Sequence, residues 1–149
     1  MDHRFDLYLN GHEHDLEYAL YPYDQYPETI IENFGTLDEF KCEHDVEHIF
    51  NPETLSSYSE SEVSSDPSLR KAVFNKGDAI HQITTGTTGF DLYPICLNRP
   101  SMGRWRYTQN KLHGFTQVHA DVDQISLKIK GVDEDTKEIK TLYEVVINN

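Results

Sequence analysis

Near its start the chain alternates apolar and polar side chains over residues 5–10, which predicts a β-strand. One face of this strand would carry Phe5, Leu7 and Leu9, and the other Asp6 and Tyr8. Asn10-Gly11 ends the alternation. A second short strand is expected over residues 16–20, so the sequence between the two strands should form a turn.

The last third of the chain shows the same period of two. Residues 115–120 and 125–130 alternate in polarity, and residues 142–147 form a third β-type run. Residues 121–124 and the charged segment 131–140 are typical of hairpin connections. These patterns predict an antiparallel meander at the end of the chain.

The middle of the chain is less regular. Residues 79–85 form a further β-type run, whereas residues 91–113 are interpreted as a long loop punctuated by Pro and Gly. Residues 37–70 are strongly acidic, and the Ser- and Glu-rich part over 56–68 has few apolar side chains to offset its ordering entropy. We therefore predict an acidic, partly disordered insertion over residues 37–70, with a short helix over residues 39–50.

Composition and charge narrow the classes of function. The length of 149 residues suits one ordinary domain. A net charge of −13 disfavours nucleic acid and anionic membranes as partners, because phosphates would be repelled. No apolar run approaches the roughly 20 residues that span a bilayer, and the first residues do not resemble a secretory signal. Cys42 and Cys96 could pair in an oxidising compartment, but the sequence alone leaves the compartment undecided.

The most specific chemical pattern is Gly11-His12-Glu13-His14, at the end of the first predicted strand. Two histidines at i and i+2 on extended backbone lie about 6 to 7 Å apart and face the same side. Metal ions in two-metal hydrolytic sites lie about 3.5 to 4 Å apart, so each ion could take one imidazole. His12 and His14 are therefore candidate metal ligands. Incidental histidines in a polar turn are the alternative interpretation.

The sequence DLYLNGHEHDLEY, which contains this pattern, resembles the last conserved motif of the purple acid phosphatases, within the calcineurin-like metallophosphoesterases. Residues 83–89 (ITTGTTG) are similar to the strand and Gly-rich turn that follow the motif in that family. Gly114-Phe115-Thr116 resembles the opening of the family's closing segment. The resemblance implies an α/β fold (α+β by content): the C-terminal portion of a β-sandwich flanked by helices and ending in an antiparallel β-meander.

The resemblance also implies a chemistry. In the family, the two histidines bind the two ions of a binuclear centre, in which iron is paired with zinc, iron or manganese. His12 would bind the divalent ion and His14 the ferric ion. In the complete enzyme the centre polarises a phosphate monoester and supplies a metal-bound hydroxide as nucleophile. Members of the family are often secreted, lysosomal or vacuolar.

The chain departs from the family pattern upstream of the histidines. The family's Asp-x-Gly, Gly-Asp-x-x-Tyr, Gly-Asn-His and Val-x-x-His motifs should precede Gly-His-x-His, but Gly11 follows only ten residues. Gly77-Asp78-Ala79-Ile80-His81 mimics one of them superficially, downstream and with His in place of Tyr. We therefore expect residues 1–149 to be the C-terminal, incomplete part of a metallophosphoesterase domain, inactive alone. Its first strand would be central in the complete sheet, so exposed strand edges should favour self-association.

Two other functions remain open. The chain could be a non-catalytic binding or scaffold module derived from this family. It could also be a small acidic, β-rich zinc protein, in which His44 and His48 share one helix face and Cys42 or Glu47 completes the site. An exposed, charged helix face is the alternative interpretation of that segment.

A cluster of basic side chains surrounds Trp105 and Tyr107 in the otherwise acidic sequence. It consists of Arg99, Arg104, Arg106, Lys111 and His113. These side chains could approach a phosphorylated substrate or neutralise nearby acidic surface. His81 and His119 lie inside predicted strands and are interpreted as structural.

Overall fold

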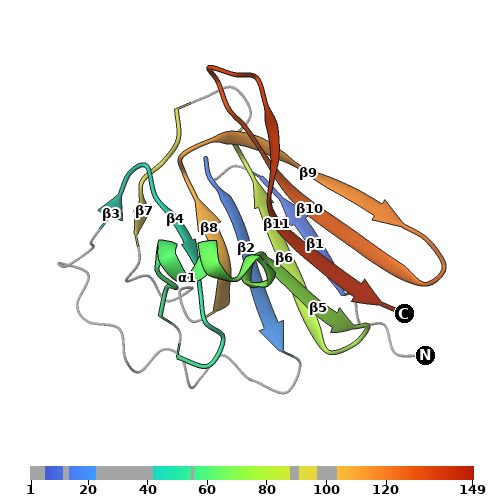
Figure 1. Cartoon of the computed structure of the whole chain (residues 1–149). Coiled ribbons are helices and arrows are strands. Elements are labelled where there is room, and N and C mark those ends of the chain that lie inside the picture. Colours follow the sequence, from blue (N-terminus) through green and yellow to red (C-terminus); the bar gives the residue numbers. More distant parts are fainter. Residues whose placement is uncertain (1–5, 12–13, 23–41, 55, 88–90, 97–103) are drawn as a thin grey trace.

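The structure, a computed structural model, describes residues 6–11, 14–22, 42–54, 56–87, 91–96 and 104–149. The described chain is mostly β, with two larger sheets and one two-stranded sheet (Figure 1). Its described helical elements are the short helix α1 (Glu60–Ser65) and the 3-10 helix η4 (Pro67–Arg70). The β content is therefore higher, and the helix content lower, than the expected α/β description implies.

The first large sheet has five strands in the order β1-β6-β2-β8-β4. These are β1 (Leu7–Asn10), β6 (Ala79–Thr85), β2 (Leu16–Pro22), β8 (Trp105–Gln109) and β4 (Glu47–Ile49). β1 runs parallel to β6, and the other pairs are antiparallel. The predicted strands over residues 5–10, 16–20 and 79–85 are thus confirmed in the described residues.

The second large sheet contains the predicted meander. Its order is β5-β11-β10-β9, with β5 (Lys71–Asn75), β11 (Ile139–Asn148), β10 (Gln124–Val132) and β9 (His113–Ala120). The β9–β10 turn is closed by the Asp121 carboxylate, which accepts hydrogen bonds from the backbone N–H groups of Asp123 and Gln124. The antiparallel meander predicted from the period of two is confirmed.

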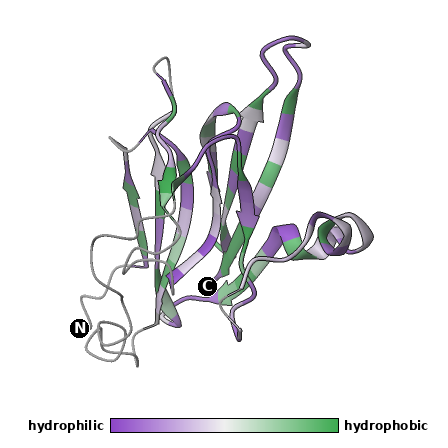
Figure 2. Cartoon of the chain, turned by 90° about the vertical axis from the view of Figure 1, so that its left-hand side faces the viewer, coloured by the Kyte–Doolittle hydropathy of each residue, from purple (hydrophilic) through white to green (hydrophobic). Residues whose placement is uncertain are grey.

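The two large sheets form the layers of a sandwich (Figure 2). Fully buried side chains from both sheets meet between the layers, among them Tyr18 and Ile83 from the first sheet and Leu127, Ile129 and Val145 from the second. Alternate residues of each strand point into this core. The strand periodicity seen in the sequence is therefore the periodicity of core burial.

Residues 39–50 do not form the predicted helix. The described part contains β3 (Cys42–Glu43) and β4, and β4 is a strand of the five-stranded sheet. Ile49 and Phe50 are consecutive and both buried, in separate apolar clusters. Burial of consecutive side chains is typical of a strand covered on both faces rather than of an amphipathic helix. Residues 37–41 lie outside the described residues.

The described residues between 56 and 70 also differ from the predicted disorder. Ser59 caps α1 by accepting a hydrogen bond from the Glu62 N–H, and the Glu62 carboxylate accepts one from the Ser59 N–H at 2.7 Å. Tyr58 and Val63 pack against the main core. A capping box and two anchoring side chains thus order a segment whose average composition favours disorder.

The predicted loop over residues 91–113 contains two strands. β7 (Ile95–Cys96) pairs with β3, and β8 lies between β2 and β4 in the first sheet. The prediction missed β8 because its buried residues Thr108 and Gln109 are polar, which leaves only Trp105 and Tyr107 to carry an apolar alternation. Cys42 and Cys96 face each other in the β3–β7 pair and form a disulfide, the pairing that the sequence left open.

β1 forms one edge of its sheet in the described structure, whereas a central position was predicted for the complete domain. It pairs with β6 on one side, and Tyr8 and Leu9 are 51% and 50% exposed. Leu9 lies opposite the fully buried Ile83 in the parallel register, so both side chains point to the same face. The expected exposure of apolar surface at a strand edge is therefore present; self-association through that edge stays a prediction.

Candidate functional site

The site lies where the parallel strands β1 and β6 end, at one edge of the first sheet. The Thr84 hydroxyl donates a hydrogen bond to the Asn10 side-chain oxygen at 3.0 Å, which joins the ends of the two strands. Gly11 follows directly, and a Cβ there would lie 3.3 Å from the carbonyl oxygen of Thr85. The close strands thus favour glycine just before the two histidines. His12 lies outside the described residues.

His14 has a defined orientation at this edge. Its Nδ1 is 2.9 Å from the carbonyl oxygen of Asp91. A carbonyl oxygen can only accept, so Nδ1 donates, and the neutral ring therefore carries its lone pair on Nε2. The ring of Tyr93 stacks on the imidazole with 4.2 Å between the centroids and 11° between the planes. The backbone N–H of Tyr93 also donates to the His14 carbonyl at 3.0 Å.

This arrangement fits the chemistry of a metal-ligating histidine. Such histidines usually donate one ring N–H to a carbonyl or carboxylate, which fixes the tautomer and orients the other nitrogen toward the metal. His14 meets this requirement through Asp91. The described part of the chain contains no group of three or more His, Cys, Asp or Glu side chains that could hold an ion. His14 thus fits as a ligand, but the described residues do not complete a metal centre.

The second and third blocks of the resemblance come together beside this edge. The Thr87 hydroxyl accepts from the Gly114 N–H at 2.7 Å and donates to the Gly114 carbonyl at 3.1 Å. His113 Nδ1 donates to the Thr87 carbonyl, and its Nε2 lies 3.2 Å from the Glu134 carboxylate. A Cβ at Gly114 would overlap the Lys130 carbonyl, which explains glycine there. The segment after β6 is thereby fixed to β9.

The alternative zinc site at Cys42, His44 and His48 is contradicted by the structure. Cys42 is oxidised in the disulfide with Cys96, and only a reduced thiolate binds zinc. The helix that would have aligned His44 with His48 is absent from the described residues 42–54. His48 instead contacts Ser57 at 3.1 Å and Glu43 at 3.4 Å.

The basic side chains around Trp105 do not converge on His14 in the described structure. The Arg104 guanidinium lies 4.5 Å from the ring centroid of Tyr21. Arg106 donates to the Trp105 carbonyl, and burial lowers the pKa of its guanidinium. Arg99 lies outside the described residues. The described members of the cluster therefore make separate local contacts, and His113 lies 3.2 Å from an acidic side chain, Glu134.

His81 and His119 lie inside strands β6 and β9, as predicted. His81 is fully buried, with its Nδ1 2.9 Å from the Tyr18 hydroxyl. His119 is exposed on β9, with its Nε2 3.6 Å from the Asp121 carboxylate. Each contacts partners away from the end of β1.

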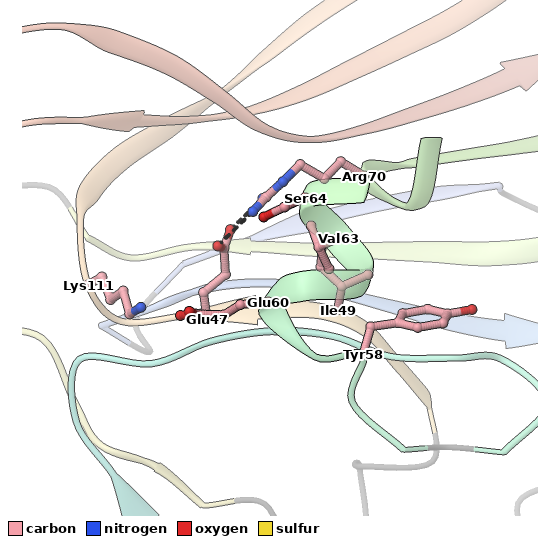
Figure 3. A pocket seen from close by; sticks show the side chains of 8 residues that line it. All are labelled: Glu47, Ile49, Tyr58, Glu60, Val63, Ser64, Arg70 and Lys111. Carbon is pink, nitrogen blue, oxygen red and sulfur yellow. Dashed lines mark hydrogen bonds and ion pairs between the residues drawn. The ribbon is translucent and has the colours of Figure 1, made fainter. Parts of the chain in front are cut away.

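A separate cavity of about 190 Å³ lies between α1 and the first sheet (Figure 3). It is lined by Glu47, Ile49, Tyr58, Glu60, Val63, Ser64, Arg70 and Lys111. The Glu47 carboxylate accepts two hydrogen bonds from Arg70, at 2.6 and 2.9 Å, and one from the Tyr107 hydroxyl at 3.1 Å. Burial raises the pKa of Glu47, but Arg70 and Tyr107 outweigh it and hold that pKa below its usual value. The Glu47–Arg70 pair links η4 to strand β4 of the first sheet.

Replacing Arg70 by methionine is expected to lower the free energy of unfolding by about 2 kcal/mol. The half-buried Glu47 carboxylate would lose its main partner, and the Leu142 carbonyl would lose a donor at 2.9 Å. Lys71→Met is the matched control, because the 3.5 Å pair of Lys71 with Glu144 is more exposed and should contribute under about 1 kcal/mol. Urea denaturation measures both. Equal losses in the two variants would contradict the structural role of the Glu47–Arg70 pair.

Sequence reasoning identified His14 but not the residues that surround it. Asp91 and Tyr93, which contact His14, lie in the segment interpreted as a loop, and no local pattern marks them. No helix in the described part of the chain is long and apolar enough to cross a bilayer. Comparisons with protein-family models, curated proteins and solved structures gave no match. A function must therefore be argued from the residues of the site.

Proposed function

We propose that this chain is the C-terminal part of a metal-dependent acid phosphatase of the purple acid phosphatase type, which hydrolyses phosphate monoesters. The observation that carries the proposal is the hydrogen bond from His14 Nδ1 to the Asp91 carbonyl. It gives His14 the tautomer and the fixed ring of a metal ligand. The ring also lies at the carboxyl ends of two parallel strands, where sheets of this type bind their ligands.

The architecture supports the proposal in two ways. The parallel β1–β6 pair and the terminal meander fit the C-terminal portion of a metallophosphoesterase β-sandwich. The open edge of β1 fits a sheet that continues with strands supplied from outside the described residues. The domain is accordingly proposed to be incomplete in residues 1–149. Where such strands are lacking, self-association through β1 is the expected substitute, which sedimentation would detect.

His12 and His14 would each bind one ion of a binuclear centre of iron with zinc, iron or manganese. When bound, the ions polarise the phosphate ester and activate the attacking water. Two imidazoles cannot fix the geometry of two ions, so the remaining ligands must come from outside the described residues. The chain alone is therefore expected to have little or no phosphatase activity.

The compartment and partners follow from the same features. The Cys42–Cys96 disulfide favours an oxidising compartment, which agrees with the secreted, lysosomal or vacuolar location common in the family. The net charge of −13 disfavours nucleic acid and anionic membranes as partners. A phosphate monoester bound by the metal centre would be the main ligand.

The test uses the natural, full-length gene product, with metal content measured by mass spectrometry and hydrolysis of p-nitrophenyl phosphate as the assay. We expect bound iron in the wild type, and His14→Ala should lose metal and at least about 100-fold in activity. His119→Ala is the control, because His119 is exposed and pairs with Asp121 on β9. A natural product without metal or hydrolysis would instead favour the non-catalytic module. Full activity in His14→Ala would also overturn the proposal.

A further inference from the structure

We propose that Asn110 and Tyr93 are positioning residues that hold the His14 imidazole in its Nδ1–H tautomer, with Nε2 directed as a metal ligand. The ligand role rests on the proposed function, whereas the tautomer and its dependence on these two residues do not. A continuous set of hydrogen bonds and ring contacts begins at the end of β8 and ends at His14.

Asn110 is the fixed end of this connection. It is 2% exposed, and its Nδ2 donates to the carbonyls of Tyr93 at 2.8 Å and Glu43 at 3.0 Å. Its Oδ1 accepts from the Val46 N–H at 2.9 Å, and its own N–H donates to the Val46 carbonyl at 3.0 Å. All the donors of this residue are used, so the side chain joins three chain segments in one orientation.

Tyr93 transmits this orientation to His14. Its carbonyl is held by Asn110, its N–H donates to the His14 carbonyl, and its ring covers one face of the imidazole. Asp91, two residues earlier, presents the carbonyl that accepts from His14 Nδ1. The backbone of residues 91–93 thus contacts His14 at its main chain, its ring face and one ring nitrogen.

These contacts decide which ring nitrogen of the neutral His14 side chain carries the proton. A neutral histidine side chain in water favours the Nε2–H form, which has no lone pair on Nε2. The Nδ1–H form is favoured here by a hydrogen bond that needs the Asp91 carbonyl at 2.9 Å. Tyr93 is 42% exposed, so its own side chain is not held by burial, and the hydrogen bond from Asn110 is what holds its carbonyl. Removing that bond should release the carbonyl and with it the tautomer.

The test is a long-range ¹H–¹⁵N correlation spectrum of the ¹⁵N-labelled, oxidised chain at about pH 8, where histidines are neutral. The spectrum distinguishes protonated from unprotonated ring nitrogens. The wild type should show His14 as the Nδ1–H form. Asn110→Ala should convert most of this signal to the Nε2–H form. Thr108→Val is the matched control, because Thr108 is fully buried on β8 and its hydroxyl has no hydrogen bond to lose in the described residues.

A second pair of variants keeps the test decisive if Asn110→Ala fails to fold. Tyr93→Phe retains the ring and the backbone contacts and should leave the His14 tautomer unchanged. Tyr93→Ala removes the stacked ring and should shift the tautomer toward Nε2–H. The His81 signals report on the core in every variant, because His81 contacts Tyr18 and Phe74 rather than residues 91–93. An unchanged His14 tautomer in Tyr93→Ala, with intact His81 signals, would overturn the proposal.

Metal affinity separates this proposal from the phosphatase function. In the full-length protein, Asn110→Ala should weaken metal retention against a competing chelator by about 10- to 100-fold, as loss of an orienting partner does. If the wild type binds no metal but the tautomer shifts as expected, the proposed function fails and the positioning role stands. If metal is bound and the tautomer does not depend on Asn110 or Tyr93, the positioning role fails alone.

Discussion

Replacing Cys42 and Cys96 by alanine is expected to lower the free energy of unfolding by about 4 kcal/mol. The disulfide joins residues 54 positions apart, so it removes much of the loop-closure entropy of the unfolded chain. The β3–β7 pair that it connects has two residues in each strand, and Cys42 is exposed. Beyond the burial of Ile95 and Cys96, few apolar contacts hold this pair together when the covalent link is removed.

Urea denaturation of the oxidised wild type, the reduced wild type and the double alanine variant measures this effect. The reduced wild type and the variant should unfold at the same, lower urea concentration. Oxidised and reduced proteins that unfold together would show that the link does not constrain the unfolded chain. Because a loss of this size approaches the whole stability of many domains, the protein should depend on an oxidising environment.

Sequence patterns predicted the elements whose burial follows a short local period. The strands β9, β10 and β11 alternate inward and outward side chains over eight or more residues each, so the period of two is legible. β4 has three residues and both its faces are covered, so it carries no alternation to detect. A short strand such as β4, at the edge of its sheet, is specified by its neighbours rather than by its own pattern.

The residues of the candidate site differ in the same way: His14 belongs to a local sequence pattern, whereas its partners do not. His14 is a candidate ligand because a spacing of two residues beside a glycine is visible in a single window of sequence. Its partner Asp91 lies 77 residues away along the chain, and Asn110 lies 17 residues from Tyr93. Side chains that orient a ligand through backbone carbonyls carry no distinctive residue type, so one sequence cannot reveal them.

Stability is expected to fall as the pH is lowered from about 6.5 to about 4, and His81 should be a principal cause. His81 is fully buried between the Tyr18 and Phe74 rings. Burial lowers its pKa from 6.5 to about 4, and this effect outweighs the negative charges of Asp6 and Asp78, which raise the pKa. Its Nε2 has no hydrogen-bond partner in the described residues, so the protonated ring would bury an Nε2–H without an acceptor.

The direction of this pH dependence follows from the number of protons that the folded and unfolded chains bind. Between the folded pKa of about 4 and the unfolded pKa of 6.5, the unfolded chain binds more protons at this position. The free energy of unfolding therefore rises with pH across this window. Above pH 6.5 the titration of His81 costs no stability, and at about pH 4 it has lowered the free energy of unfolding by about 3 kcal/mol. Paired carboxylates such as Glu47 also lose stabilisation at low pH, so the His81 contribution must be isolated by a variant.

His81→Phe provides that variant, because it keeps an aromatic ring in the core and removes the titration. Urea denaturation at several pH values between about 7.5 and 4 should show a smaller loss of stability in His81→Phe than in the wild type. His119→Ala, which removes an exposed histidine, should retain the wild-type dependence. Parallel curves for wild type and His81→Phe would contradict the assignment.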